Sequence, residues 1–270
     1  MSSQHTTSVP SGLQVAKHLP RSTLVWGGGF VLMLGSSLAA ILTHPFLTPA
    51  QQSIWTAKVF SRVIWLTGCD FSVSYDPAFD RTVPSVFCFN HTNFLDAHTA
   101  CRTIPQPFVG LMLAWHFKIP GYGWMMRATH GIPVHPASAG RTDELTVQVR
   151  DRVDHGLSIL AFPEGHRTMD GKVRKYKRGM FFMARSAGIP VIPVAVRGMY
   201  AVNRKGSKLF IPGPVSVYVG PQIDPSTLDD DGITQLADAM HSAVSAYVEG
   251  RDRSGAGIAA LAEWSPTASV

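Results

Sequence analysis

The feature that most constrains this chain is a long segment near its N-terminus that carries no charge. No Lys, Arg, Asp or Glu occurs between Arg21 and Lys58. Within that gap the apolar run at residues 23–43 is long enough, as a helix, to cross a hydrocarbon core of about 30 Å. A cleaved signal peptide has a shorter apolar run, so we predict a retained membrane helix. Residues 1–22 are then expected to form a polar N-terminal extension.

A second apolar segment, residues 54–66, follows a turn that contains Pro45 and Pro49. Its apolar residues recur at helical spacing, whereas Lys58 and Arg62 share another face. Such a helix can lie in the membrane interface, pack on a soluble domain, or form a hairpin with the first helix that enters one leaflet. We therefore assign residues 23–68 to a membrane helix or helical hairpin with an interfacial helix.

Charge and cysteine usage indicate the partner and the compartment. The 270 residues carry a net charge of +6 and a pI near 9.4, yet only 16% of them are charged. A basic but apolar chain favours membrane lipid as its partner and argues against nucleic acid. Its three cysteines have neither paired nor metal-ligand spacing, which favours a reducing compartment. Nothing in the sequence sets an oligomeric state.

From residue 83 onward, strand-like apolar runs alternate with helical patterns. This alternation predicts an α/β domain at residues 69–249, with a mostly parallel or mixed sheet flanked by helices. The tail at 250–270 is rich in Gly, Ala and Ser, and we expect it to be mobile. The expected strands lie at 85–89, 108–112, 131–134, 157–163, 189–196 and 214–220, and the expected helices at 93–103, 121–128, 139–155 and 232–249.

The stretch "NHTNFLD", residues 90–96, leaves the first of these strands and reaches an aspartate five residues after its histidine. Asn93 is a natural N-cap for the next helix, which places Asp96 in the first turn. His91 can reach Asp96 only if it precedes that helix, because residues five apart on one helix point about 140° away from each other. The pair would then fix the histidine tautomer and leave the other ring nitrogen as a base. A capping interaction without chemistry is the alternative.

A second polar stretch, "AFPEGHRTMDG" at 161–171, also ends a buried strand. Gly165 allows a ligand to approach the backbone closely, and Arg167 offers a planar fork for a phosphate or carboxylate. Glu164 could orient that arginine or bind a substrate hydroxyl. The alternative is a surface turn with a solvated charge pair.

Five basic residues follow within seven positions, in "KVRKYKR" at 172–178. They form either a solvated face or a clamp on anionic headgroups or on the phosphates of coenzyme A. The histidines at 98, 116, 130, 135 and 166 fit no common metal-ligand spacing, so we expect no metal site.

Four motifs together resemble those of the glycerolipid acyltransferases typified by lysophosphatidic acid acyltransferase. "NHTNFLD" is similar to their His-x4-Asp motif and "FPEGHRT" to their Glu-Gly-x-Arg motif. "KIPGYGWMMRATHGIPV" at 118–134 resembles the second motif and "VIPVAV" at 191–196 the fourth, and all four stand in the family's order. The combination is much more specific than any one short motif.

The resemblance implies a helix-flanked α/β acyltransferase at a membrane, with no cofactor and with acyl-CoA or acyl carrier protein as substrate. It implies that His91 and Asp96 are the catalytic pair. We expect the inner membrane of a bacterium, with the active site facing the cytoplasm. The residues expected to bind substrate are Glu164, Gly165, Arg167 and Thr168, and possible contacts to a phosphate or to coenzyme A are Arg127, Lys175 and Arg178.

One departure from the family pattern concerns the acceptor. The family's second motif commonly closes with an arginine that is thought to meet the acceptor phosphate, and Pro136 stands at that place here. Arg127, Arg141, Arg167 or the cluster at 172–178 could supply the charge. The resemblance implies 1-acyl-glycerol-3-phosphate as acceptor, with a lyso-ornithine lipid or another lysophospholipid as an open alternative. Two other classes also stay open: a metallohydrolase and a lipid-binding module without turnover.

Overall fold

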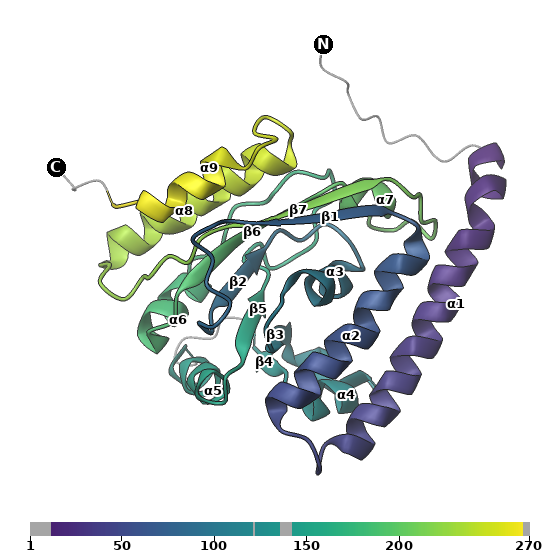
Figure 1. Ribbon diagram of the computed structural model, residues 1–270, viewed down its shortest axis with the longest axis horizontal. Coiled ribbons are helices and arrows are strands. Elements are labelled where there is room, and N and C mark those ends of the chain that lie inside the picture. Colours follow the sequence, from purple (N-terminus) through teal and green to yellow (C-terminus); the bar gives the residue numbers. More distant parts are fainter. Residues whose placement is uncertain (1–11, 121, 136–141, 267–270) are drawn as a thin grey trace.

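The computed structural model describes residues 12–120, 122–135 and 142–266 of the 270-residue chain. Its centre is a seven-stranded sheet with the order β1-β7-β6-β2-β5-β3-β4 (Figure 1). Neighbouring strands are parallel except β6 and β7, which are antiparallel, so the predicted mixed α/β class is confirmed. The strands are β1 (Asp70–Tyr75), β2 (Val86–Phe89), β3 (Phe108–Leu113), β4 (Ile132–Val134), β5 (Ser158–Ala161), β6 (Val191–Arg197) and β7 (Pro214–Val219).

Helices cover both faces of the sheet. Figure 1 shows α1 and α2 side by side with α3 on one side, and α8 with α9 on the other. The helices are α1 (Gly12–Thr43), α2 (Pro49–Thr67), α3 (Asp96–Thr103), α4 (Tyr122–Ala128), α5 (Thr142–Asp154), α6 (Gly179–Ala187), α7 (Met199–Val202), α8 (Asp230–Val248) and α9 (Ala256–Ala259), with 3-10 turns η1 (Ala114–Lys118) and η2 (Ala260–Glu263).

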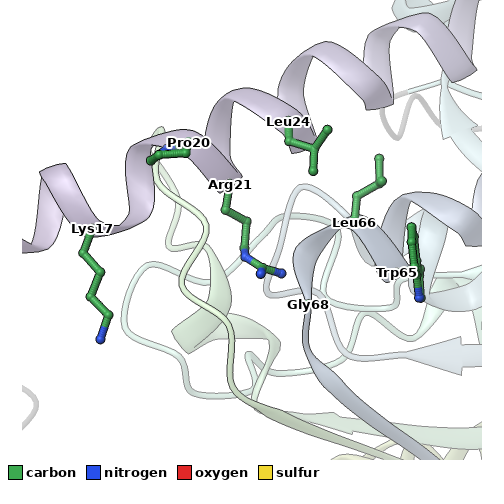
Figure 2. Close-up of a pocket in the computed structure, with 7 residues that line it drawn as sticks. All are labelled: Lys17, Pro20, Arg21, Leu24, Trp65, Leu66 and Gly68. Atoms are coloured by element: carbon green, nitrogen blue, oxygen red, sulfur yellow. The ribbon is translucent and has the colours of Figure 1, made fainter.

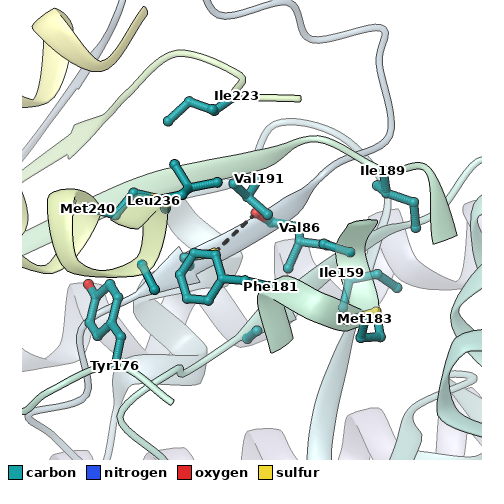
Figure 3. Close-up of a cluster of buried hydrophobic side chains, with 14 of the residues drawn as sticks. Val86, Ile159, Tyr176, Phe181, Met183, Ile189, Val191, Ile223, Leu236 and Met240 are labelled. Atoms are coloured by element: carbon teal, nitrogen blue, oxygen red, sulfur yellow. Dashed lines mark hydrogen bonds between the residues drawn. The ribbon is translucent and has the colours of Figure 1, made fainter. Parts of the chain in front are cut away.

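Strand β2 explains why a sheet covered in this way has continuous apolar strands. Val86 and Cys88 belong to the core under α6 and α8, part of which is drawn in Figure 3. Phe87 and Phe89 belong to the core under α1, α2 and α3. All four are fully buried, because successive residues of a strand point to opposite faces. The run "VFCF" therefore lies at the centre of the sheet.

The helix pair α1 and α2 is held by local signals that the sequence carries. At the start of α2, Thr48 and Gln51 form a reciprocal capping box, with Pro49 in the first turn. At its end, Gly68 has a left-handed conformation with φ 68°. Figure 2 shows Arg21 of α1 reaching over Gly68, where any side chain would collide with the guanidinium. The negative, C-terminal end of the α2 dipole also stabilises a cation at this place.

Helix α1 begins at Gly12 rather than at residue 23, so residues 12–22 of the expected N-terminal extension are helical and continue into the apolar run. The charged residues Lys17 and Arg21 do not mark the start of the helix, because both residue types are good helix formers and both side chains are exposed. Residues 1–11 lie outside the described part of the chain. The segment Val15–Thr43 is long and apolar enough to cross a membrane.

The expectation of a mobile tail is wrong for residues 250–266. The side chain of Asp252 accepts the amides of Gly255 and Gly257 and so starts α9. Ile258 and Leu261 then pack into the core beside α8. Two apolar residues three positions apart are enough to dock a short helix that is otherwise rich in small residues. Residues 267–270 lie outside the described part.

Strand β1 and helix α6 were not predicted, nor were the short helices α7 and α9 and the turns η1 and η2. Strand β1 is an edge strand whose side chains alternate between exposed and partly buried, so it lacks a continuous apolar run. Helix α6 has only nine residues and begins directly after the basic cluster at 172–178, without a side-chain N-cap that would indicate its start in the sequence.

Candidate active site

Two loops meet at the carboxyl ends of the strands because β2 and β5 are adjacent and parallel. The catalytic loop, residues 90–96, leaves β2, and the glutamate loop, residues 162–168, follows β5. Carboxyl ends of parallel strands are where ligands bind in open α/β sheets. The two motifs singled out from the sequence are thus brought together by strand pairing.

His91 and Asp96 form the hydrogen bond that their spacing predicts. Nδ1 of His91 lies 2.7 Å from Oδ2 of Asp96, and Oδ2 also accepts the backbone amides of Thr92 at 2.6 Å and Asn93 at 2.8 Å. Asp96 is the first residue of α3, where the helix dipole favours a negative charge. A carboxylate that accepts three N–H groups holds the Nδ1–H tautomer of His91.

The ring of His91 is held in place from one side. It stacks on Phe162 of the glutamate loop, with ring centroids 4.2 Å apart and an interplanar angle of 24°. The side chain of His91 is 24% exposed, whereas that of Asp96 is 3% exposed. With Nδ1 committed to Asp96, Nε2 is the nitrogen that can take a proton from a group outside.

Glu164 connects the glutamate loop to the backbone of the catalytic loop and to that of the basic segment 172–178. Its Oε1 accepts the amide of His91 at 2.6 Å and its Oε2 accepts the amide of Arg174 at 2.8 Å. Burial raises the pKa of Glu164 to about 7, against the effect of these two hydrogen bonds. The geometry gives Glu164 a positioning role, and direct contact with a substrate stays a prediction.

Gly165 and Thr168 also help to fix the glutamate loop at the carboxyl end of β5. Gly165 has φ +76°, a conformation that strains any residue with a side chain, and Nζ of Lys177 lies 2.6 Å from where its Cβ would stand. The amide of Thr168 donates to the carbonyl of His91 at 2.9 Å. The hydroxyl of Thr168 donates to Asp170 at 2.8 Å. Their contact with substrate stays a prediction as well.

Arg167 differs from its neighbours because its guanidinium faces a hollow. It lies 6.0 Å from the ring centroid of Phe94, and both residues line a hollow of about 730 Å³ beside α1. Among the described residues, no carboxylate pairs with Arg167. A free guanidinium next to the catalytic loop can bind an anionic group of a substrate.

The other three basic residues do not gather around His91. Arg127 lies on α4, where it donates to the carbonyl of Gly123 at 3.2 Å. Lys175 lies 3.9 Å from Asp238 of α8, on the other side of the sheet. Arg178 is exposed at the start of α6. Pro136 and Arg141 lie outside the described residues, and within the described part no three His, Cys, Asp or Glu side chains converge to hold a metal ion.

Two asparagines that were not predicted as site residues fix the catalytic loop from behind. Asn90 pairs with the backbone of Val196 through both ends of its amide, at 3.0 and 2.7 Å. Asn93 is not the N-cap, which is Leu95. Instead its side chain accepts the amide of Leu95 at 2.7 Å and donates to the carbonyls of Met199 and Asn203 at 2.6 and 3.1 Å. Their position next to His91, directly after an apolar run, was the only sequence signal for either role.

Comparison with known proteins agrees with the four motifs. Residues 71–197 match the family model described as Acyltransferase. A 1-acyl-sn-glycerol-3-phosphate acyltransferase of Chlamydomonas reinhardtii is 31% identical over 60% of this chain and 48% of its own length. The human enzyme named 1-acyl-sn-glycerol-3-phosphate acyltransferase beta is 24% identical over 80% of this chain and 77% of its own.

The chain spans about half the length of the Chlamydomonas relative and of a chloroplastic relative from Brassica napus, at 48% and 47%. The fold is similar to the crystal structure of the 1-acyl-sn-glycerophosphate acyltransferase from Thermotoga maritima, with a TM-score of 0.72 and 20% identity over 87% of this chain and 96% of that one. The motifs and the family model over residues 71–197 therefore agree in their similarity to the glycerolipid acyltransferases typified by lysophosphatidic acid acyltransferases, and the fold is similar to that of one such enzyme.

Proposed function

We propose that this chain is a membrane-bound O-acyltransferase, which moves a fatty acyl group from a thioester to a hydroxyl of a lysophospholipid. The observation that carries the proposal is the 2.7 Å contact between His91 and Asp96 beside an open hollow. A base with no protein nucleophile beside it suits a reaction in which the substrate supplies the hydroxyl. The names of the relatives favour 1-acyl-glycerol-3-phosphate as acceptor, with phosphatidic acid as product.

In the proposed reaction, Nε2 of His91 takes the proton of the acceptor hydroxyl while the oxygen attacks the thioester carbonyl. Asp96 stabilises the imidazolium that forms. The tetrahedral intermediate then collapses, the C–S bond breaks, and the thiolate leaves with the proton from His91. The new ester and a free thiol are the products, and no other reactant is needed.

For the donor we propose an acyl thioester of coenzyme A or of acyl carrier protein, both of which are anionic. Support comes from the segment 172–178, where Val173 and Tyr176 are buried anchors and the five cations are exposed. Lys177 packs against Gly165 of the glutamate loop, so this positive surface adjoins the candidate site.

We further propose that α1 lies in one leaflet instead of spanning the bilayer. The apolar part of α1 is tied to the domain on both sides: Ser22, which precedes it, accepts the amide of Phe210 at 2.9 Å, and Nδ1 of His44, which follows it, lies 3.1 Å from the carbonyl of Ala128. A segment bound to the same domain before and after its apolar part cannot cross to the far side of a bilayer. Its outward side is apolar, with the exposed residues Leu24, Phe30, Val31, Leu34, Leu38 and Leu42.

We place the protein at the inner membrane of a bacterium, with its active site facing the cytoplasm. The three cysteines are free, which fits a reducing compartment. Single cysteines introduced at the exposed positions Lys17→Cys and Phe46→Cys in a cysteine-free background test the arrangement in sealed vesicles. An impermeant reagent should label both from the same side, and labelling from opposite sides would show that α1 spans the bilayer.

The activity is tested with the purified full-length protein, labelled acyl-CoA or acyl carrier protein, and a panel of lysolipids whose products are resolved by mass. Acylation of lysophosphatidic acid supports the leading acceptor, and acylation of a lyso-ornithine lipid supports the alternative. No transfer with any acceptor would favour a lipid-binding module. Activity that depends on an added metal ion would favour the metallohydrolase.

A further inference from the structure

A hollow of about 730 Å³ lies between α1 and the loop at residues 203–209, and we call it the α1 groove. Its volume falls within the usual range of ligand sites. Arg167 and Phe94 line it beside the catalytic loop, and Leu19 and Trp26 line it from α1. Lys208 and Leu209 contribute from the 203–209 loop. The groove therefore adjoins the candidate active site and α1 at the same time.

The wall formed by the 203–209 loop is bonded to the catalytic loop on one side. Asn93 of the catalytic loop donates to the carbonyl of Asn203 at 3.1 Å. Asn203 in turn donates to the carbonyls of Ser207 and Leu209, both at 3.0 Å. This chain of hydrogen bonds sets the position of the 203–209 loop relative to His91.

The same loop is bonded to α1 on its other side. Nε1 of Trp26 donates to the carbonyl of Lys208 at 2.8 Å. The ring of Trp26 lies 5.2 Å from that of Phe94 and 5.3 Å from that of Phe210. Since Arg167 lies over Phe94, a continuous row of rings leads from the Arg167 guanidinium to α1. The walls of the groove are fixed relative to one another, because α1, the catalytic loop and the 203–209 loop are joined by these contacts.

Charge and polarity within the α1 groove match one kind of molecule. Arg167 and Lys208 are both cationic, and neither pairs with a carboxylate in the part of the chain that the structure describes. The apolar side is exposed, with Leu19 53%, Trp26 40% and Phe94 51% accessible. An anionic headgroup can pair with the two cations, and a single hydrocarbon chain can pack on the three apolar side chains.

We propose that the α1 groove binds the lysolipid acceptor, with its anionic group between Arg167 and Lys208 and its acyl chain along Leu19, Trp26 and Phe94. This rests on the proposed function and extends it, because it assigns a binding role to Lys208 and to α1. An acceptor that lies in the same leaflet as α1 can enter sideways, so its chain never has to cross water. Lys208 then supplies a charge that Pro136 does not.

The test compares Lys208→Gln and Lys208→Glu with Lys205→Gln as the matched control. Lys205 is an exposed lysine of the same loop that does not line the groove. We expect Lys208→Glu to raise the acceptor KM by about tenfold, as loss of a charge-assisted contact does, and Lys208→Gln to raise it less. The donor KM should stay within about twofold in all three variants, because the donor binds elsewhere.

Two acceptors distinguish the source of the negative charge. Lysophosphatidic acid carries a phosphate and a lyso-ornithine lipid carries a carboxylate, and the true acceptor is the one whose KM depends on Lys208. Binding of a fluorescent lysolipid to full-length His91→Ala, with no donor present, gives a readout without turnover. In that background, Lys208→Glu should weaken binding and Lys205→Gln should not.

The outcomes separate this inference from the proposed function. Failure of the wild-type protein to acylate any lysolipid would overturn the proposed function. Normal acylation with an acceptor KM that Lys208→Glu leaves unchanged would overturn only the assignment of the α1 groove. Because Lys208 is exposed, we expect its variants to keep the melting temperature of the wild type, and this measurement checks that the fold is intact.

Discussion

Around the catalytic pair, Asp96 of the catalytic loop accepts three N–H groups and Glu164 of the glutamate loop accepts two, whereas in the adjoining α1 groove Arg167 and Lys208 have no carboxylate partner among the described residues. The first region is nearly closed to solvent, and the second is open. A proton acceptor must be held in one orientation, which requires many short bonds. A site for a lipid must exchange its occupant, which requires charges and rings that are free to meet it. Mutations in the two regions should therefore change different kinetic constants.

The largest effect is expected from His91→Ala. A general base contributes roughly 10²–10⁴-fold, and the two carboxylates in contact with His91, Asp96 and Glu164, are buried and bonded to backbone amides, so kcat should fall by about that factor. The acceptor KM should change little, because the α1 groove is untouched. Steady-state kinetics on the purified variant check this, and near-normal turnover would refute the mechanism.

Asp96→Asn should have the next largest effect, a fall in kcat of about 10²-fold or more, because the amide no longer selects the Nδ1–H tautomer. Thr92 and Asn93 donate to the same oxygen, Oδ2, that His91 contacts, so a neutral amide would have to serve all three N–H groups with its one oxygen. Asp96→Glu keeps the charge and serves as the control for geometry. If Asp96→Asn raised the acceptor KM and spared kcat, the two regions would not be separate.

Glu164→Gln should lower kcat by about tenfold, because one of its two backbone amides would face an NH₂ group in place of an oxygen. The variant should also change how stability depends on pH. The pKa of Glu164 is raised from 4.5 to about 7, so the folded state binds more protons between these values and stability falls as pH rises. A shift of this size amounts to roughly 3 kcal/mol.

Thermal melts of the wild type and of Glu164→Gln across pH 4.5 to 7 check this prediction. The wild type should lose stability over the range, and the variant should show a flatter profile. Parallel profiles would mean that another group controls the stability in this window.

The smallest effect is expected from Arg167→Lys, which keeps the charge and loses the planar fork. We expect the acceptor KM to rise by about threefold to tenfold, with kcat and the donor KM nearly unchanged. Equal effects on both substrates would remove Arg167 from the acceptor site and would blur the distinction between the two regions.

The sequence revealed the catalytic loop more fully than the groove, for a physical reason. His91 and Asp96 are five residues apart, and a strand followed by a helix is enough to bring them together. The α1 groove combines α1, the catalytic loop, the glutamate loop and residues 203–209, so no short motif contains it. Sequence spacing carries local geometry, whereas packing of distant segments appears only in the fold.

The same distinction explains the fold-level differences. The buried central strands were predicted because they are continuously apolar, and the edge strand β1 was missed because it is not. The tail was judged by its small residues, although Ile258 and Leu261 dock it. The roles of Glu164 and Asn93 could not be read from the sequence, since their partners are backbone groups of other segments.

Strand β1 has a consequence for the order in which the molecule forms. It pairs with β7 in the register Asp70 to Pro214, a separation of 144 residues along the chain. During synthesis, α1, α2 and β1 leave the ribosome long before their partner strand exists. Contacts of such long range form slowly, and the unpaired edge of β1 is open to association meanwhile. A helix pair that enters the lipid first would hold the growing chain at the membrane surface, apart from other nascent chains, until β7 arrives to complete the sheet.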